Sequence, residues 1–161
     1  MANATIATPG EDLIISEIDI AAPPDRVFRA LTDKQQLLHW WNEDEGCRSK
    51  TWEIDPRLGG RWHWTGHDPT GKVVVNGISE FEMKGEITEF DPPRTLAYTW
   101  GANFHRTPWK ESWVRWELTP IASGTHVKVT HGGLKDLPID RKEYSEGWPG
   151  VLGLLRRYCE Q

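Results

Sequence analysis

The histidines are the side chains of this sequence best suited to acid–base or metal chemistry. His63 and His67 are four residues apart, a spacing that brings two rings to one metal ion when both lie on a helix. Here the surrounding sequence predicts a strand that leads into a turn, so the rings need not converge, and no third ligand is evident. His131 and His39 could each place a polar group in a pocket, but a histidine on an apolar face is more often a hydrogen-bonded core residue.

The carboxylates and cysteines show no catalytic pattern. The acidic run at 43–45 is typical of a solvated loop, and Cys47 and Cys159 are too far apart in sequence to form a metal-type motif. The sequence contains no nucleophile elbow, phosphate loop or dinucleotide fingerprint. We therefore assign no catalytic residue, no metal and no cofactor.

The aromatic residues carry the main functional signal. The chain contains 10 Trp against 4 Phe and 3 Tyr, and an indole is large, apolar and able to donate one hydrogen bond. Several of these indoles come from different predicted elements that should converge on one interior, where they could bind a flat apolar molecule. The predicted ligand-binding residues are Trp41, Trp62, Trp64, Trp100, Phe104, Trp116, His131, Trp148 and Leu152. The alternative is a solid Trp-rich core without a pocket.

Alternating apolar residues predict a sheet for most of the chain. Strands are expected at 13–21, 52–54, 61–65, 72–75, 78–90, 94–100, 112–119 and 125–131, with a bulge near Gly85. Tight turns between them indicate an antiparallel meander. The segment 101–111 lacks a period and is predicted to be a long loop that could gate a pocket.

Three helices should accompany this sheet. Pro23 and Pro24 suit the first turn of a short helix, and Asp33 with Gln36 resembles the capping box of a second. A longer helix is expected from a capping box at Asp140 to about Cys159. Its apolar arc would cover the sheet, and its proline and three glycines predict either a bend that admits ligand or a static kink. The arc consists of Tyr144, Trp148, Val151, Leu152, Leu155 and Cys159.

The totals fit one α+β domain. Residues 1–12 have no periodicity and are expected to be a flexible leader, followed by a single domain over 13–161. The net charge of -5 leaves no basic footprint for nucleic acid. No apolar run has the roughly 20 residues of a membrane span, and no signal peptide is evident, so a cytoplasmic location is expected.

Five segments together resemble a known family. They are APPDRVFRALTDKQQLLHWW, DPRLGGRWHW, GEITEFDPPRTLAYTW, SWVRWELTPIASGTHVKVTHGGL and YSEGWPGVLGLLRRYCE. In this order they resemble the activator of heat-shock protein 90 ATPase homologue-like proteins of the START/SRPBCC superfamily. The resemblance implies the helix-grip fold: a seven-stranded curved antiparallel sheet around a long C-terminal helix, two short helices after the first strand, and a central cavity. It also implies that the segment after the Trp-Trp pair borders the cavity entrance, where Glu45 could face a ligand.

These features predict the binding of a hydrophobic or aromatic small molecule by a non-catalytic carrier, sequestration or stress-response protein. One alternative is a cyclase-, aromatase- or hydrolase-like enzyme, in which His131, His39 or Glu45 would move protons in the same cavity. Another is a co-chaperone-like partner of heat-shock protein 90, which would need an exposed apolar patch. The chain is expected to be a monomer or a homodimer.

Overall fold

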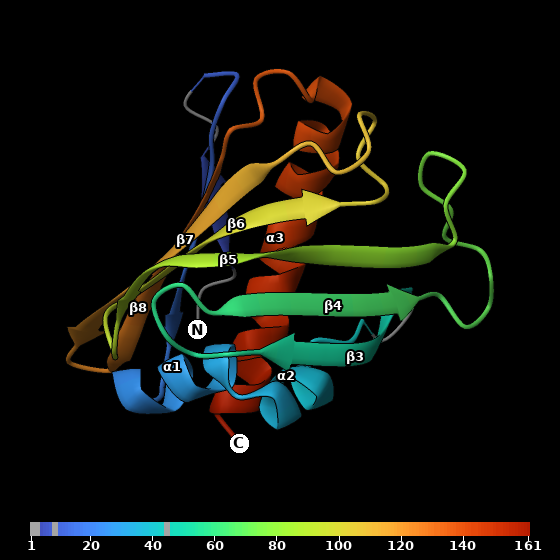
Figure 1. Cartoon of the computed structure of the whole chain (residues 1–161). Helices are drawn as coiled ribbons and strands as arrows, with labels where there is room; N and C mark the ends of the chain where they lie inside the picture. Colours follow the sequence, from blue (N-terminus) through green and yellow to red (C-terminus); the bar gives the residue numbers. More distant parts are fainter. Residues whose placement is uncertain (1–3, 8–9, 44–45) are drawn as a thin grey trace.

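The computed structural model describes residues 4–7, 10–43 and 46–161. It contains one antiparallel sheet and three helices (Figure 1). The strands are β1 (Thr5–Ala7), β2 (Ile14–Ile20), β3 (Arg48–Ile54), β4 (Arg61–His67), β5 (Glu80–Asp91), β6 (Thr95–Ala102), β7 (Ser112–Ile121) and β8 (Gly124–Gly132). The helices are α1 (Pro24–Thr32), α2 (Lys34–Trp40) and α3 (Pro138–Cys159).

The sheet is curved and wraps around α3. Its strand order is β1-β2-β8-β7-β6-β5-β4-β3. The helix α3 runs along one face, which we call the inner face, and α1 and α2 lie across one end (Figure 1). The helix-grip architecture is confirmed, but with eight strands instead of seven. The additional strand is β1, which pairs with β2 at the sheet edge and lies in the segment for which the sequence predicted no regular structure.

Two local predictions about the strands are wrong. Residues 72–75 form no strand, and only an isolated bridge joins Val75 to Ile78. The bulge lies between Ile87 and Glu89 instead of at Gly85. Gly85 has a different role, because a Cβ there would lie 1.8 Å from the carbonyl oxygen of Thr99 and 2.5 Å from Nε1 of Trp62.

The two short helices are held together by polar contacts to the backbone. Asp33 is the N-cap of α2, as predicted, and its Oδ1 accepts the N–H of Gln35 at 2.9 Å. The buried Trp40 donates its indole N–H to the carbonyl of Ala30 at 2.8 Å, which fixes α2 against α1.

The long helix begins earlier than predicted and without a capping box. Its N-cap is Leu137, with Pro138 in the first turn. Asp140, expected to cap it, is only 1% exposed, and its Oδ2 accepts the backbone N–H of Arg106 at 3.0 Å. Trp148, Leu152, Leu155 and Cys159 are buried, so the apolar arc faces the sheet. Pro149 lies inside a continuous helix.

Candidate functional site

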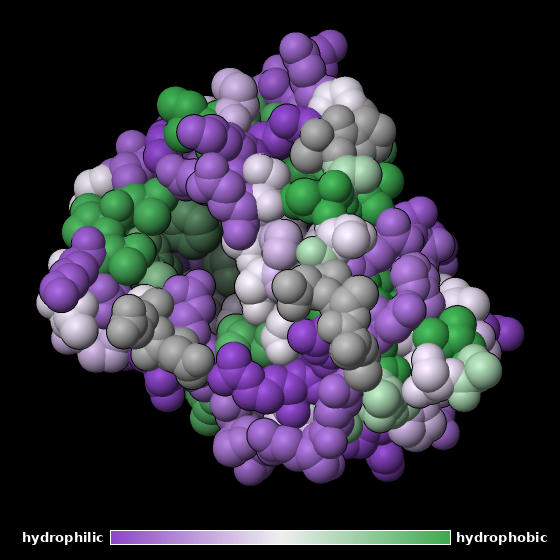
Figure 2. Space-filling model, turned by 180° about the vertical axis from the view of Figure 1, so that it is seen from behind, coloured by the Kyte–Doolittle hydropathy of each residue, from purple (hydrophilic) through white to green (hydrophobic). Residues whose placement is uncertain are grey.

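A pocket opens between the inner face of the sheet and α3, along which its lining residues run from Asp140 to Leu154. It has a volume of about 250 Å³. Figure 2 shows it as a hollow with hydrophobic residues in its depth and with both hydrophobic and hydrophilic residues at its rim. We call this the main pocket; its lining residues are Trp41, Glu43, Cys47, Trp64, Val75, Phe81, Met83, Phe104, Asp140, Glu143, Tyr144, Val151 and Leu154.

A smaller space adjoins the main pocket beside the middle of α3. This inner recess has a volume of about 120 Å³. It is lined by Trp41, Met83, Trp100, Tyr144, Gly147, Trp148 and Val151. Four of these residues also line the main pocket, so the two spaces share a wall.

Five of the nine predicted ligand-binding residues lie on these walls. Trp41, Trp64 and Phe104 line the main pocket, and Trp100 and Trp148 line the inner recess. Four elements and one loop converge there, because these residues come from the end of α2, from β4, β6 and α3, and from the segment that joins β6 to β7.

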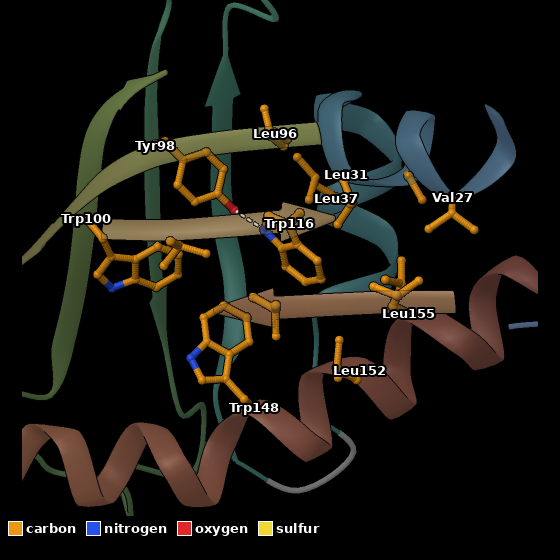
Figure 3. Close-up of a cluster of buried hydrophobic side chains, with 14 of the residues drawn as sticks. Val27, Leu31, Leu37, Leu96, Tyr98, Trp100, Trp116, Trp148, Leu152 and Leu155 are labelled. Carbon is orange, nitrogen blue, oxygen red and sulfur yellow. Dashed lines mark hydrogen bonds between the residues drawn. The ribbon is translucent and has the colours of Figure 1, made fainter. Parts of the chain in front are cut away.

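The other four predicted residues lie in the solid core and do not line the pocket. Trp116, His131 and Leu152 are fully buried, and Trp62 is 2% exposed. Figure 3 shows Trp116 and Leu152 packed between the sheet and α3 among aliphatic side chains. Trp62 lies across Gly85 and donates to the carbonyl of Thr99 at 3.0 Å.

A hydroxyl links the indole of Trp64 to the backbone of Trp41. Nε1 of Trp64 donates to Oγ of Ser49 at 2.9 Å, and that Oγ donates to the carbonyl oxygen of Trp41 at 2.5 Å. Because both donors are satisfied by the protein, Trp64 and the backbone of Trp41 are fixed in position without a ligand.

The core histidine behind the recess is locked in one neutral form. Nδ1 of His131 accepts the indole N–H of Trp148 at 3.1 Å. Its Nε2 therefore carries the proton and donates to Oγ of Ser112 at 2.8 Å. That hydroxyl donates to the carbonyl of Trp100 at 2.9 Å. Burial, with a smaller contribution from His105, lowers the pKa of His131 to about 3.

A second neutral histidine fixes the tyrosine of the pocket wall. His105 donates from Nδ1 to the carbonyl of Lys110 at 2.9 Å, so its Nε2 accepts the Tyr144 hydroxyl at 2.6 Å. The same hydroxyl accepts the indole N–H of Trp100 at 3.0 Å. Burial lowers the pKa of His105 and raises that of Tyr144.

An ion-pair network closes one side of the main pocket. Arg106 donates to Glu143 at 2.7 Å and lies 3.5 Å from the buried carboxylate of Asp140. This network ties the segment between β6 and β7 to the first turns of α3. The predicted gating segment is therefore held by side-chain contacts at its middle.

A thiol and a carboxylate form another part of the wall. Glu43 accepts the backbone N–H of Cys47 at 3.3 Å. Burial, and secondarily the charge of Glu43, raises the pKa of the Cys47 thiol to about 11, so this thiol is protonated at neutral pH. The family resemblance places the segment after the Trp-Trp pair at the cavity entrance, but its residues Asp44 and Glu45 lie outside the described residues.

The remaining candidate histidines lie away from the main pocket. His39 is exposed, with its ring centroid 5.5 Å from that of Tyr158, so it is not a polar anchor inside the pocket. His63 and His67 point outward from β4 and contact carboxylates of β5, Glu82 at 2.5 Å and Glu80 at 3.3 Å. The first of these histidines borders a separate depression of about 520 Å³ on the outer face, which is lined largely by charged residues.

Most of the wall residues other than tryptophan were not predicted from the sequence. Phe81 and Met83 alternate on the inner face of β5, so periodicity could have identified them. Val151 was placed in the apolar arc but not assigned to the pocket. Val75 and Cys47 lie in irregular segments, and no periodic signal marks them.

The arrangement can bind an apolar guest more readily than it can transfer a proton. Apolar and aromatic side chains form most of the main pocket, and both interior histidines have every ring nitrogen engaged in a hydrogen bond.

Among the residues that the structure describes, no helix combines the length and hydrophobicity needed to cross a membrane.

Solved structures share this fold. A protein from Rhodobacter sphaeroides superposes with a TM-score of 0.77 at 17% identity, over 98% of this chain and 95% of that one. Protein NE0264 from Nitrosomonas europaea gives a TM-score of 0.76 at 21% identity, over 96% of this chain and 99% of that one. An AHSA1-like protein from Aeromonas hydrophila gives a TM-score of 0.70 at 20% identity, over 91% of this chain and 90% of that one. No curated protein matches the sequence.

A family model identifies the chain more directly. The model described as "Activator of Hsp90 ATPase homolog 1-like protein" matches residues 21–160, which include α1 to α3 and strands β3 to β8. The resemblance seen in the sequence is thereby confirmed, and the chain belongs to the Activator of Hsp90 ATPase homolog 1-like family of the START/SRPBCC superfamily.

Proposed function

We propose that this protein binds a hydrophobic or aromatic small molecule in the main pocket and acts as a carrier or a sequestering protein, without catalysis. The observation that carries this proposal is the preformed pocket of about 250 Å³, with Trp41, Trp64 and Phe104 on its wall. Concave, mostly apolar sites with a few polar groups are the usual form of a small-molecule site.

The hydrogen bonding of the interior supports a non-catalytic role. A general acid or base needs a pKa near the working pH and a free nitrogen or oxygen within reach of the substrate. The pKa of His131 is lowered to about 3, and its ring nitrogens contact Ser112 and Trp148. His105 is engaged in the same way by Lys110 and Tyr144. Neither is poised to move a proton at neutral pH.

Filling the pocket should abolish binding. The change Val151→Trp places an indole in both the main pocket and the inner recess, because Val151 lines both. We expect calorimetric titration with 4-phenyl-1-butanol to show saturable binding to the unmodified protein and at least about tenfold weaker binding to the variant.

A matched control lies on the same helix. Ile139 is 54% exposed and does not line the main pocket, so Ile139→Trp should leave the affinity unchanged. Equal affinities of all three proteins would place the binding elsewhere, and an absence of saturable binding to the unmodified protein would argue against the proposed function. Conversion of added compounds, followed by mass spectrometry, would favour the catalytic alternative.

The family description favours a second candidate, a partner role with the chaperone Hsp90. Large hydrophobic side chains exposed on the described surface include Leu58 at 65% and Val74 at 54%. Pull-down with purified Hsp90 and measurement of its ATPase rate tests this candidate separately from ligand binding. An unchanged rate and no capture would count against it.

A further inference from the structure

The main pocket combines apolar walls with carboxylates, and all of its charged lining residues are negative. Glu43, Asp140 and Glu143 line it, and no Lys, Arg or His is among its described lining residues. Asp140 is 1% exposed, so its charge is screened little by solvent. A charged group on a guest would therefore meet negative side chains and no positive one on the wall.

Two arginines next to the pocket compensate only part of this charge. Arg106 contacts both Asp140 and Glu143. Arg48 donates to the backbone carbonyl of Glu43 at 3.2 Å. Even if both guanidinium groups are counted, three carboxylates and two cations leave a net charge of −1, and neither arginine lines the pocket.

The aromatic residues of the wall also favour a positively charged guest. The ring faces of Trp, Tyr and Phe attract a cation within about 6 Å through their quadrupole. Trp41, Trp64 and Phe104 provide such rings in the same pocket as the carboxylates. A protonated amine can therefore be stabilised both by the rings and by the carboxylates, while the rest of its carbon skeleton is removed from water.

We propose that the guest of the main pocket is a hydrophobic amine. Its apolar or aromatic body would fill the space between β4, β5 and α3, with its ammonium group beside Glu43 and Glu143. This inference rests on the proposed binding function and names the chemical class of the ligand. A fatty acid or another anionic amphiphile would bring a like charge to these carboxylates and binds more weakly.

Three probes with one carbon skeleton test the sign of the charge. We expect 4-phenylbutylamine to bind about tenfold more tightly than 4-phenyl-1-butanol at low ionic strength, and 4-phenylbutyrate to bind most weakly. Calorimetric titration of the full chain gives the three affinities under one set of conditions. Added salt should reduce the difference in affinity between the amine and the alcohol.

Charge-removing variants locate the effect. Glu43→Gln and Glu143→Gln should each reduce the preference for amine over alcohol about threefold. The matched control is Glu86→Gln, since Glu86 is exposed on β5 and lines the outer depression instead of the main pocket. That control should leave the preference unchanged.

The outcomes separate this inference from the function on which it rests. If the alcohol or the carboxylate binds as tightly as the amine, and Val151→Trp weakens that binding, the pocket is a ligand site but the amine class is wrong. If the amine preference survives in both Glu43→Gln and Glu143→Gln, it does not arise in this pocket. If no probe binds the unmodified protein, the binding function fails as well.

Discussion

Lowering the pH from about 6.5 to about 5 should reduce the free energy of unfolding by roughly 2 kcal/mol through His131 alone. The pKa of this residue is about 3 in the folded protein, against 6.5 for an unperturbed histidine. Between these values the unfolded chain binds a proton that the folded protein does not bind. The contribution of His131 to the free energy of unfolding is therefore fully present above the pKa of the unfolded chain. It is lost as the pH falls below that value.

Two other histidines with shifted pKa values determine the pH range in which the effect of His131 can be measured. Burial also lowers the pKa of His105, so it destabilises the protein over the same acidic range. His126 acts in the opposite direction, because hydrogen bonds to Glu17 and Asp19 raise its pKa. The contribution of His126 is fully present well below the unfolded pKa and is lost as the pH rises through its raised folded pKa. Between pH about 5 and about 6.5 it offsets only part of the loss caused by the buried pair.

Urea unfolding at a series of pH values measures this slope. The change His131→Gln keeps one acceptor for Trp148 and one donor for Ser112, but removes the titrating group. The variant should be less stable at neutral pH and should show a shallower loss toward pH 5. Ile139→Gln, which changes an exposed side chain without a titrating group, should keep the original slope. A slope unchanged in His131→Gln would contradict the neutral, buried assignment.

Replacing Trp116 by alanine should cost about 3–5 kcal/mol of unfolding free energy. This side chain is fully buried, and its indole N–H donates to the Tyr98 hydroxyl at 2.8 Å (Figure 3). Truncation leaves a large cavity and removes the partner of a buried hydroxyl. Trp113 lies on the opposite face of the same strand and is 39% exposed, so Trp113→Ala should cost clearly less than Trp116→Ala.

The variant Trp116→Phe separates packing from binding. It retains most of the apolar volume and loses the N–H, so we expect a cost of about 1–3 kcal/mol. Trp116 does not line the main pocket, and this variant should bind 4-phenyl-1-butanol with unchanged affinity. Loss of binding in a folded Trp116→Phe protein would show that the distinction between core and pocket wall is wrong.

Sequence periodicity was sufficient for the sheet because one of its faces is buried. Val114 and Trp116 on β7, and Val127 and Val129 on β8, are all buried, as their alternation predicted. The same rule could not identify β1, whose three residues are all exposed and carry no alternating signal. It also predicted a strand at 72–75, where apolar residues lie in an irregular connection.

Periodicity assigns a residue to a face but not to a position along it. Trp62 and Trp64 share the inner face of β4, yet only Trp64 lines the main pocket. Trp62 is covered by Trp52, Tyr98 and Trp100, whose ring centroids lie 4.9–5.9 Å from its own. Trp52 lies on β3, and Tyr98 and Trp100 lie on β6, so these contacts depend on the packing of separate strands.

Local sequence motifs failed where a long-range contact decided the outcome. Asp140 has the spacing of a capping residue, but its carboxylate instead binds Arg106 in the segment between β6 and β7. His105 in the same segment forms a hydrogen bond with Tyr144 on α3. Both contacts join residues more than thirty positions apart, which a pattern within one segment cannot show.

The methyl group of Met83 offers the most direct test of the claim that the main pocket receives an apolar guest. The chain has two methionines, and Met83 lines both the main pocket and the inner recess. In protein labelled with ¹³C at its methionine methyl groups, titration with 4-phenyl-1-butanol should shift the Met83 signal to saturation, and the same titration of the Val151→Trp variant is the control. Nuclear Overhauser contacts from that methyl group to the phenyl ring should appear. A saturated complex in which the Met83 signal neither shifts nor contacts the ring would contradict the account.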